Sequence, residues 1–213
     1  MVFRCAFLNC HNLFPVGAHP TRGPRTADAL EQQVRDLAAT LRAAASGRAR
    51  PDIVGLCEVG DEALGRRVAE ALGRDAYHAV WSGVPRAGAV SGPDTGLMVL
   101  YRPEVVRRAL PEIVTDRPSP GARHKWLAVP FQLLAGSRAP FWLVVNHWTS
   151  QFGGGEATTE PSRRNSAREL GRFFLDTARI TTEAMVLVGD FNCEPPARPF
   201  VLERRAGEFL LDP

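Results

Sequence analysis

Short apolar segments that each end in a polar side chain constrain this chain more than any other feature. Runs of this length predict buried strands. Four of them lead directly to an amide, a carboxylate or an imidazole: Asn9, Glu58, His147 and Asp190. Taken singly, such residues are more typical of turns, of exposed surfaces, or of core positions where the side chain is hydrogen-bonded to a backbone carbonyl. Because functional side chains gather at strand ends in layered α/β folds, their repetition predicts one shared site.

The segment 185–192, Met-Val-Leu-Val-Gly-Asp-Phe-Asn, shows this pattern most densely. Its four apolar residues predict a short buried strand, after which Gly189 is expected to allow a tight turn. Asp190 and Asn192 follow, and in extended backbone residues two apart point to the same side. Their oxygens suit a hard cation such as Mg²⁺. By itself the segment is more typical of an ordinary turn, so the other strand ends decide its interpretation.

Helical and strand patterns alternate along the first half of the chain, and a meander of strands follows. Apolar stripes and end signals predict helices at residues 26–45, capped by Thr26 or Asp28, at 61–73, starting at Asp61, and at 161–177. Strands are predicted at residues 3–9, 52–57, 77–81, 95–101, 113–114, 126–134, 140–146 and 185–188, and loops at 15–25, 85–94 and 149–160. This mixture predicts an α+β fold with helices packed outside two sheets.

Length and composition predict one globular domain over residues 1–213. The hydrophobic fraction of 45% excludes a disordered chain. The net charge of +3 does not repel phosphates, but it is too small to identify a nucleic-acid-binding protein. Lys125 is the only lysine among 26 basic residues. Arginine suits phosphate oxygens, although a coding bias towards Ala, Arg, Gly and Pro explains this usage equally simply.

The cysteines predict a reduced, cytoplasmic protein. Cys5, Cys10, Cys57 and Cys193 lack the paired spacing of a metal site, and three of them fall in or beside predicted core strands. The N-terminal apolar run is too short for a secretory signal. No stretch of the sequence approaches the length of a membrane span, so no membrane partner is expected.

Five segments together resemble the endonuclease/exonuclease/phosphatase superfamily, the metal-dependent hydrolases related to DNase I. The matching segments are residues 7–14 (FLNCHNLF), 52–58 (DIVGLCE), 95–101 (TGLMVLY), 146–150 (NHWTS) and 188–192 (VGDFN). They occur in the family's order and at compatible spacing. The resemblance implies a four-layer α/β/β/α sandwich of two mixed sheets.

The resemblance also implies roles for individual residues. The metal ligands would be Asn9, Glu58 and Asp190, and the catalytic residues His147, Asp190 and Asn192. Substrate contacts would come from His11, Asn146, Arg163 and Arg164. His11 stands where the family often has an acid. The implied cofactor is Mg²⁺, with Mn²⁺ as the alternative.

One departure from the family concerns its C-terminal Ser-Asp-His. No histidine follows His147 in this sequence, and Asp212 is the last acid. The resemblance therefore implies a sandwich that is incomplete at its C-terminus. Loss of a general acid–base group costs a factor of about 10²–10⁴, so the chain alone is expected to have little or no hydrolase activity.

Three functions remain open from the sequence. The first is a divalent-metal phosphodiesterase, a nuclease acting on nucleic acid. The second is a phosphatase or phosphodiesterase acting on a small-molecule or lipid phosphoester. The third is a non-catalytic subunit completed by a partner chain or by a C-terminal segment. Trp81, Trp126, Trp142 and Trp148 are candidates for stacking on bases, although core positions are more common for tryptophan.

Overall fold

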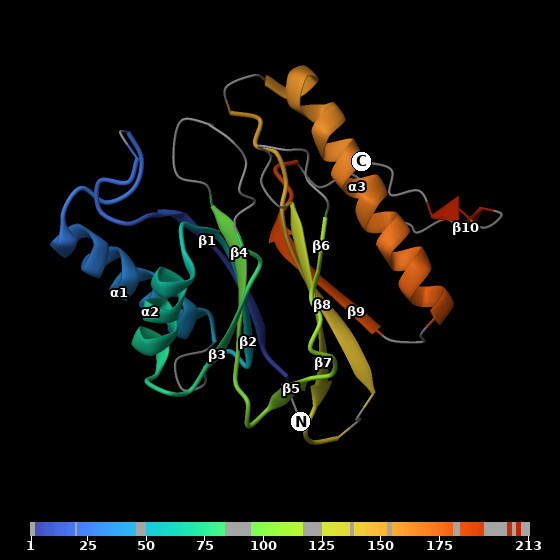
Figure 1. Cartoon of the computed structure of the whole chain (residues 1–213), viewed down its shortest axis with the longest axis horizontal. Coiled ribbons are helices and arrows are strands. Elements are labelled where there is room, and N and C mark those ends of the chain that lie inside the picture. The colour runs from blue at the N-terminus through green and yellow to red at the C-terminus, as the bar shows by residue number, and fades with distance from the viewer. Residues whose placement is uncertain are drawn as a thin grey trace.

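Two β-sheets packed face to face, with helices on both outer faces, form the computed structural model (Figure 1). The structure describes residues 3–19, 21–45, 50–83, 95–116, 125–136, 139–152, 155–180, 184–193, 204–205 and 208–209. The predicted four-layer α/β/β/α sandwich of two mixed sheets is confirmed. The predicted loop at 85–94 and the terminal Asp212 lie outside the described residues.

The first sheet has the strand order β1-β2-β4-β3. Its strands are Cys5–Leu13 (β1), Ile53–Val59 (β2), His78–Trp81 (β3) and Gly96–Tyr101 (β4). Strands β1 and β2 are parallel, and the other pairs are antiparallel. The parallel pair is connected by helix α1 (Ala27–Ala44), and helix α2 (Glu62–Leu72) follows β2.

Both of these helices begin where the sequence predicts, and the cap of α1 is Thr26, the first of its two candidates. Thr26 Oγ1 accepts a hydrogen bond from the Ala29 N–H (3.1 Å), and Asp61 Oδ1 accepts one from the Leu64 N–H (2.8 Å). These bonds satisfy amide groups that would otherwise lack a partner in the first helical turn.

The second sheet has the order β5-β7-β8-β9, with β6 paired to β7. Its strands are Val106–Arg108 (β5), Val114–Thr115 (β6), Trp126–Leu133 (β7), Pro140–His147 (β8) and Ala184–Asp190 (β9). Strands β8 and β9 are parallel, and helix α3 (Gly155–Ile180) connects them across the outer face of the sheet. The short strands β10 (Arg204–Arg205) and β11 (Glu208–Phe209) form a separate antiparallel pair.

Three apolar clusters fill the spaces between the four layers. One lies between α1, α2 and the first sheet, and includes Leu41 and Val68. The second lies between the sheets, where Val99, Leu127 and Leu143 are fully buried. The third joins the second sheet to α3. Burial of these side chains supplies the main driving force that holds the layers together.

Helix α3 begins earlier than the sequence predicts. Its described start is Gly155, whereas we predicted a loop to residue 160 and a helix from Pro161. Proline lacks an N–H and is usually tolerated only in the first helical turn. Here side-chain bonds support the preceding turn, because Thr159 Oγ1 donates to the Gly155 carbonyl and accepts from Arg163 Nη1.

Strand β9 differs from the prediction in two respects. We predicted a buried strand, but Ala184 and Leu187 are exposed and Val186 and Val188 only half-buried. Gly189 does not form the predicted turn, because it still pairs with Asn146 of β8. The chain leaves the sheet only after Asp190.

All four cysteines are free, and Cys10 and Cys57 are buried. Among the described residues, no helix is both long and apolar enough to cross a membrane.

Candidate active site

Four polar side chains meet where two parallel strand pairs end. Asn9 lies in β1 and Glu58 in β2, while His147 and Asp190 are paired residues at the ends of β8 and β9. Asn9 Nδ2 lies 3.0 Å from Glu58 Oε1 and 3.2 Å from Asp190 Oδ2, so one amide bridges the two sheets. His147 Nε2 lies 3.5 Å from Glu58 Oε1. The structure therefore brings the four predicted residues together.

Glu58 is held in place by an irregularity of the first sheet. Its φ angle is 58°, and the strand register shifts beside it towards both β1 and β4. The Asn12 N–H donates to Glu58 Oε2 (2.8 Å), while Asn9 donates to Oε1. A left-handed glutamate costs about 1–2 kcal/mol, so the surrounding bonds must hold this conformation.

Left-handed residues cluster at this end of the sandwich. Among the residues that the structure describes, the non-glycine residues with positive φ are His11, Asn12, Glu58, Asp75 and Asn192, and all except Asp75 lie in the segments that form the site. Strained backbone persists where surrounding structure enforces it, and it is common at functional sites. The cluster is thus an independent indication of function.

Asp190 and Asn192 do not project side by side as predicted. Strand β9 ends at Asp190, and Asn192 has a φ of 51°, so the backbone between them is not extended. Asp190 Oδ1 accepts from the Asn192 N–H (3.0 Å), and Asn192 Nδ2 donates to the Trp148 carbonyl (3.0 Å). Asn192 therefore connects the turn after β9 to the segment after β8.

Asn146 does not reach the site. Its side chain is fully buried, donates to the carbonyls of Val144 and Val188 (each 3.2 Å) and accepts from Trp148 Nε1 (3.3 Å). Side chains alternate between the two faces of a strand, so Asn146 and His147 cannot both face the same site. The predicted substrate contact of Asn146 is corrected to a structural role.

The other predicted substrate-binding residues differ in accessibility. His11 is exposed, and its N–H donates to Asn9 Oδ1 (2.9 Å). Arg163 is only 5% exposed and donates to the Thr149 carbonyl (3.3 Å), which ties α3 to the segment after β8. Arg164 is exposed and pairs with Glu160 (2.7 Å). Their contacts with substrate stay predictions, and burial makes such a contact least favourable for Arg163.

The oxygens of Glu58 and Asp190 suit a divalent cation. Mg²⁺ takes one or two protein carboxylates and keeps several waters. Within the described residues, no group of three His, Cys, Asp or Glu side chains is arranged to hold a metal. Asn9 turns its NH₂ group towards both carboxylates, which is the geometry of a positioning residue; metal ligation by Asn9 stays a prediction.

Electrostatics at the strand ends favours a cation. Burial is the main cause that raises the pKa of the Cys57 thiol well above its usual range, and Cys10, Glu58 and Asp190 raise it further. Burial also raises the pKa of Cys10, with Glu58 adding to the shift. Both thiols therefore stay protonated, and the negative field of Glu58 acts on both of them, whereas that of Asp190 acts on Cys57.

A model of the Endonuclease/Exonuclease/phosphatase family matches residues 6–210. The chain belongs to this family. No curated protein matches the chain. The family includes nucleases, phosphatases and phosphodiesterases, and its fold is a hydrolase fold.

Solved structures from the endonuclease/exonuclease/phosphatase superfamily share this fold. The human Nocturnin catalytic domain with bound sulfate has a TM-score of 0.55 at 16% identity, over 78% of this chain and 58% of that one. A mannosyl-6-phosphatase of Bacteroides thetaiotaomicron gives 0.61 at 16%, over 90% and 66%. Humanized D. rerio TDP2 gives 0.58 at 15%, over 90% and 63%. The chain thus spans about three fifths of the length of these structures.

Sequence reasoning missed two residues that the structure draws attention to. Asn12 supplies the backbone N–H that holds Glu58 Oε2, and no local pattern indicates such a bond between residues 46 positions apart. Phe152 is an exposed aromatic side chain that shortly follows His147. Its only signal in the sequence is an apolar residue inside a Gly/Thr-rich segment for which we predict a loop.

Proposed function

We propose that this chain is a divalent-metal-dependent phosphodiester hydrolase that cleaves nucleic acid. The observation that supports it is the convergence of Asn9, Glu58, His147 and Asp190 from both sheets, with Asn9 bridging the two carboxylates. Phosphoryl transfer depends mainly on positioning and electrostatics, and these four groups supply both.

Each side chain has a distinct part in the proposed reaction. Glu58 would hold a Mg²⁺ or Mn²⁺ ion, and the ion would neutralise charge on the phosphate oxygens. Asp190 accepts a proton from the attacking water, since a carboxylate at this position can act as a general base. His147 donates a hydrogen bond to a non-bridging oxygen, and Asn9 keeps both carboxylates in place.

The decisive experiment measures cleavage and metal binding on the same variants. We expect slow Mg²⁺-dependent cleavage of an end-labelled oligonucleotide at long incubation, and its loss with EDTA. Asp190→Asn should lower the rate by about 10²–10⁴-fold, because the general base is lost. Glu58→Gln should instead weaken Mn²⁺ binding, measured by paramagnetic relaxation of water protons.

The matched control is Glu62→Gln. Glu62 is an exposed acid at the start of α2 that pairs with Arg66, so its substitution should change neither readout. Unaltered Mn²⁺ binding in Glu58→Gln, together with no cleavage by the unsubstituted chain, would overturn the proposal.

A second candidate is hydrolysis of a small-molecule or lipid phosphoester. It is favoured by the fold shared with the mannosyl-6-phosphatase, since the same four groups would serve a phosphomonoester. Release of inorganic phosphate from mannose 6-phosphate or an inositol phosphate, faster than oligonucleotide cleavage, would select this function.

A third candidate is a non-catalytic subunit completed by a partner chain or a C-terminal segment. One observation favours it, because apolar side chains that pack between the sheets are only half-buried on, or just before, the outermost strands β1 and β9: Phe3, Cys5, Phe7, Val186 and Val188. Light scattering would then detect association.

For the enzyme we infer a cytoplasmic location, supported by its four free thiols.

A further inference from the structure

Phe152 is unusual among the apolar side chains at the surface. It is 98% exposed, whereas the other exposed large apolar residues in the described part of the chain are 38–48% exposed. Scattered, partly exposed apolar residues are normal on protein surfaces. A phenyl ring held almost entirely in water has a hydration cost that folding does not relieve, which points to a ligand that covers it.

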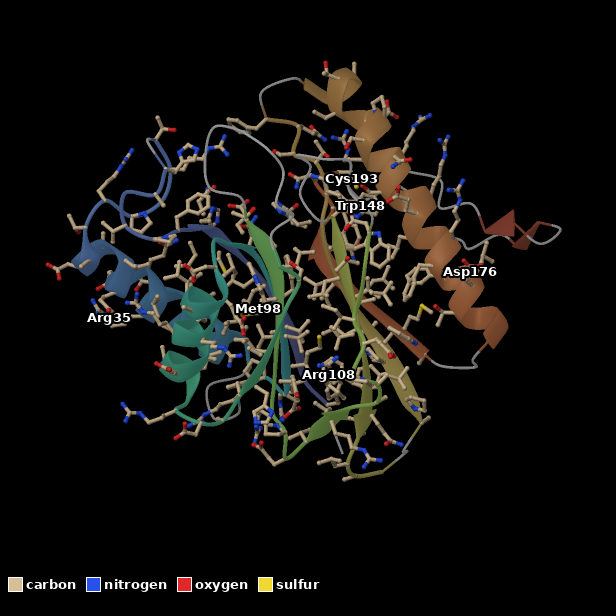
Figure 2. All side chains as sticks on the ribbon, viewed as in Figure 1. Arg35, Met98, Arg108, Trp148, Asp176 and Cys193 are labelled. Carbon is tan, nitrogen blue, oxygen red and sulfur yellow. The ribbon has the colours of Figure 1, made fainter. Side chains whose placement is uncertain are left out.

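The ring lies close to the candidate site along the chain. It follows His147, the last residue of β8, by four intervening residues, and precedes α3. Figure 2 labels Trp148 and Cys193 at this same end of the sandwich, above the strand tips and away from Arg108. The segment that carries Phe152 therefore begins directly after the strand end that holds His147.

Hydrogen bonds attach the segment before Phe152 to both site and helix. Gln151 Nε2 donates to the Asn192 carbonyl (3.2 Å), and the Phe152 N–H donates to Ser150 Oγ (3.1 Å). Thr149 Oγ1 lies 2.7 Å from Ser162 Oγ of α3. The ring is consequently attached to a segment that is fixed beside Asn192, and less conformational entropy is lost when a ligand stacks on it.

We propose that Phe152 is a stacking platform for an unpaired nucleobase of the substrate, beside the phosphodiester that the site cleaves. This inference rests on the proposed function and narrows it to single-stranded or locally unpaired nucleic acid. Stacking on an aromatic side chain tolerates any base sequence, because every base presents a flat face. Bases within a duplex are already stacked, so a duplex gains less from the ring.

The kinetic test compares two substrates that differ only in their bases. One is a single-stranded oligonucleotide, and the other is an abasic strand of the same length. We expect Phe152→Ala to lower kcat/KM on the first by about 5- to 150-fold, mainly through KM. The abasic strand should be cleaved equally by both proteins, and Phe152→Trp should restore cleavage of the first strand.

Leu110→Ala is the matched control. Leu110 is an exposed apolar residue two positions after Arg108, which Figure 2 places away from Trp148 and Cys193, so its loss should leave both substrates unaffected. Phe152 touches little of the protein, and the substitutions should not impair folding.

A binding measurement tests base stacking on Phe152 even if the protein cleaves no substrate. Phe152→Trp adds a fluorophore to the protein. Its emission is obtained by subtracting the emission of the unsubstituted chain. We expect oligo(dT) to quench this emission and the abasic strand to leave it unchanged. Equal effects of Phe152→Ala on the two substrates, or no base-dependent quenching, would overturn the inference. Base-independent cleavage would leave the proposed hydrolase standing, whereas base-dependent quenching without hydrolysis would support stacking alone.

Discussion

The two sheets contribute to the site in different ways. The first sheet supplies Asn9 and Glu58 from distorted strands, with a shifted register and left-handed backbone. The second sheet supplies His147 and Asp190 from a parallel pair whose register runs without interruption from Phe141 to His147. One half of the site therefore depends on local strain, and the other on regular pairing.

This difference shows that neither sheet carries a site alone. The bond from Asn9 to Asp190 and the contact between His147 and Glu58 both cross the interface between the sheets. The geometry of the site thus depends on how closely the sheets approach each other. Substitutions can test the interface, the strained half and the regular half separately.

The largest effect is expected from Gly55→Ala, at the interface itself. An added Cβ would lie 2.8 Å from Val145 Cγ2 and 3.1 Å from Val188 Cγ2 in the opposite sheet. Overpacking of this kind costs about 1–3 kcal/mol of stability, and it should move the half-sites apart. We expect a lower urea midpoint and a loss of activity at urea concentrations where the protein is still folded.

Gly171→Ala is the control for this prediction. Gly171 lies in α3, and an added Cβ meets nothing within 4 Å. Alanine should stabilise the helix there by about 0.5–1 kcal/mol and leave activity unchanged. Equal behaviour of the two variants would mean that sheet separation does not control the site.

A smaller effect should distinguish the strained half from the regular half. At Glu58, with a φ of 58°, glycine should be more stable than alanine by about 1–2 kcal/mol, because alanine disfavours left-handed backbone. At His147 the order should reverse, with alanine better by about 0.5–1 kcal/mol, because glycine loses more entropy in a strand. Urea unfolding of the four variants measures both differences, and the same order at both positions would refute the comparison.

The smallest effect concerns the thiols on either side of the site. Desolvation raises the pKa of all three thiols, but by far the most for the buried Cys10 and Cys57, which flank the first half; Cys193 follows the second half and is exposed. Iodoacetamide at mildly alkaline pH should modify Cys193 first and the buried thiols only as the protein unfolds. Mass spectrometry of peptides would show this order, and early labelling of Cys57 would contradict it.

The same thiols give stability a pH dependence. Unfolded cysteine releases its proton near pH 8.5, whereas burial keeps Cys10 and Cys57 protonated in the folded state above that pH. The stabilisation is complete below pH 8.5 and decreases as the pH rises further. Replacing Cys57 by alanine should flatten this decrease between pH 8.5 and 10.

Local signals predicted much of the fold. The N-terminal caps Thr26 and Asp61 fixed the starts of two helices, because a cap depends on residues only three positions away. The strand ends also predicted correctly which four residues meet. Strand β5 and the early start of α3 were missed, because a three-residue strand and a helix turn supported by side-chain bonds leave little pattern.

The details of the site depended on contacts between distant residues. The left-handed backbone of Glu58 is coupled to a bond from Asn12, and no sequence pattern encodes that pairing. Asn146 was different, because strand alternation already placed its side chain opposite to that of His147. There the signal was present, and the resemblance to a motif outweighed it.

The close approach of Gly189 to Asn146 permits β9 only one register against β8. A Cβ at this position would lie 2.5 Å from both the Cβ and the carbonyl oxygen of Asn146. Sliding β9 by one residue would bring Val188 or Asp190 opposite Asn146, where neither side chain fits, and would turn every side chain of the strand to the other face. The absence of a side chain at Gly189 therefore favours one register of β9 against β8 during folding. In that register Asp190 pairs with His147.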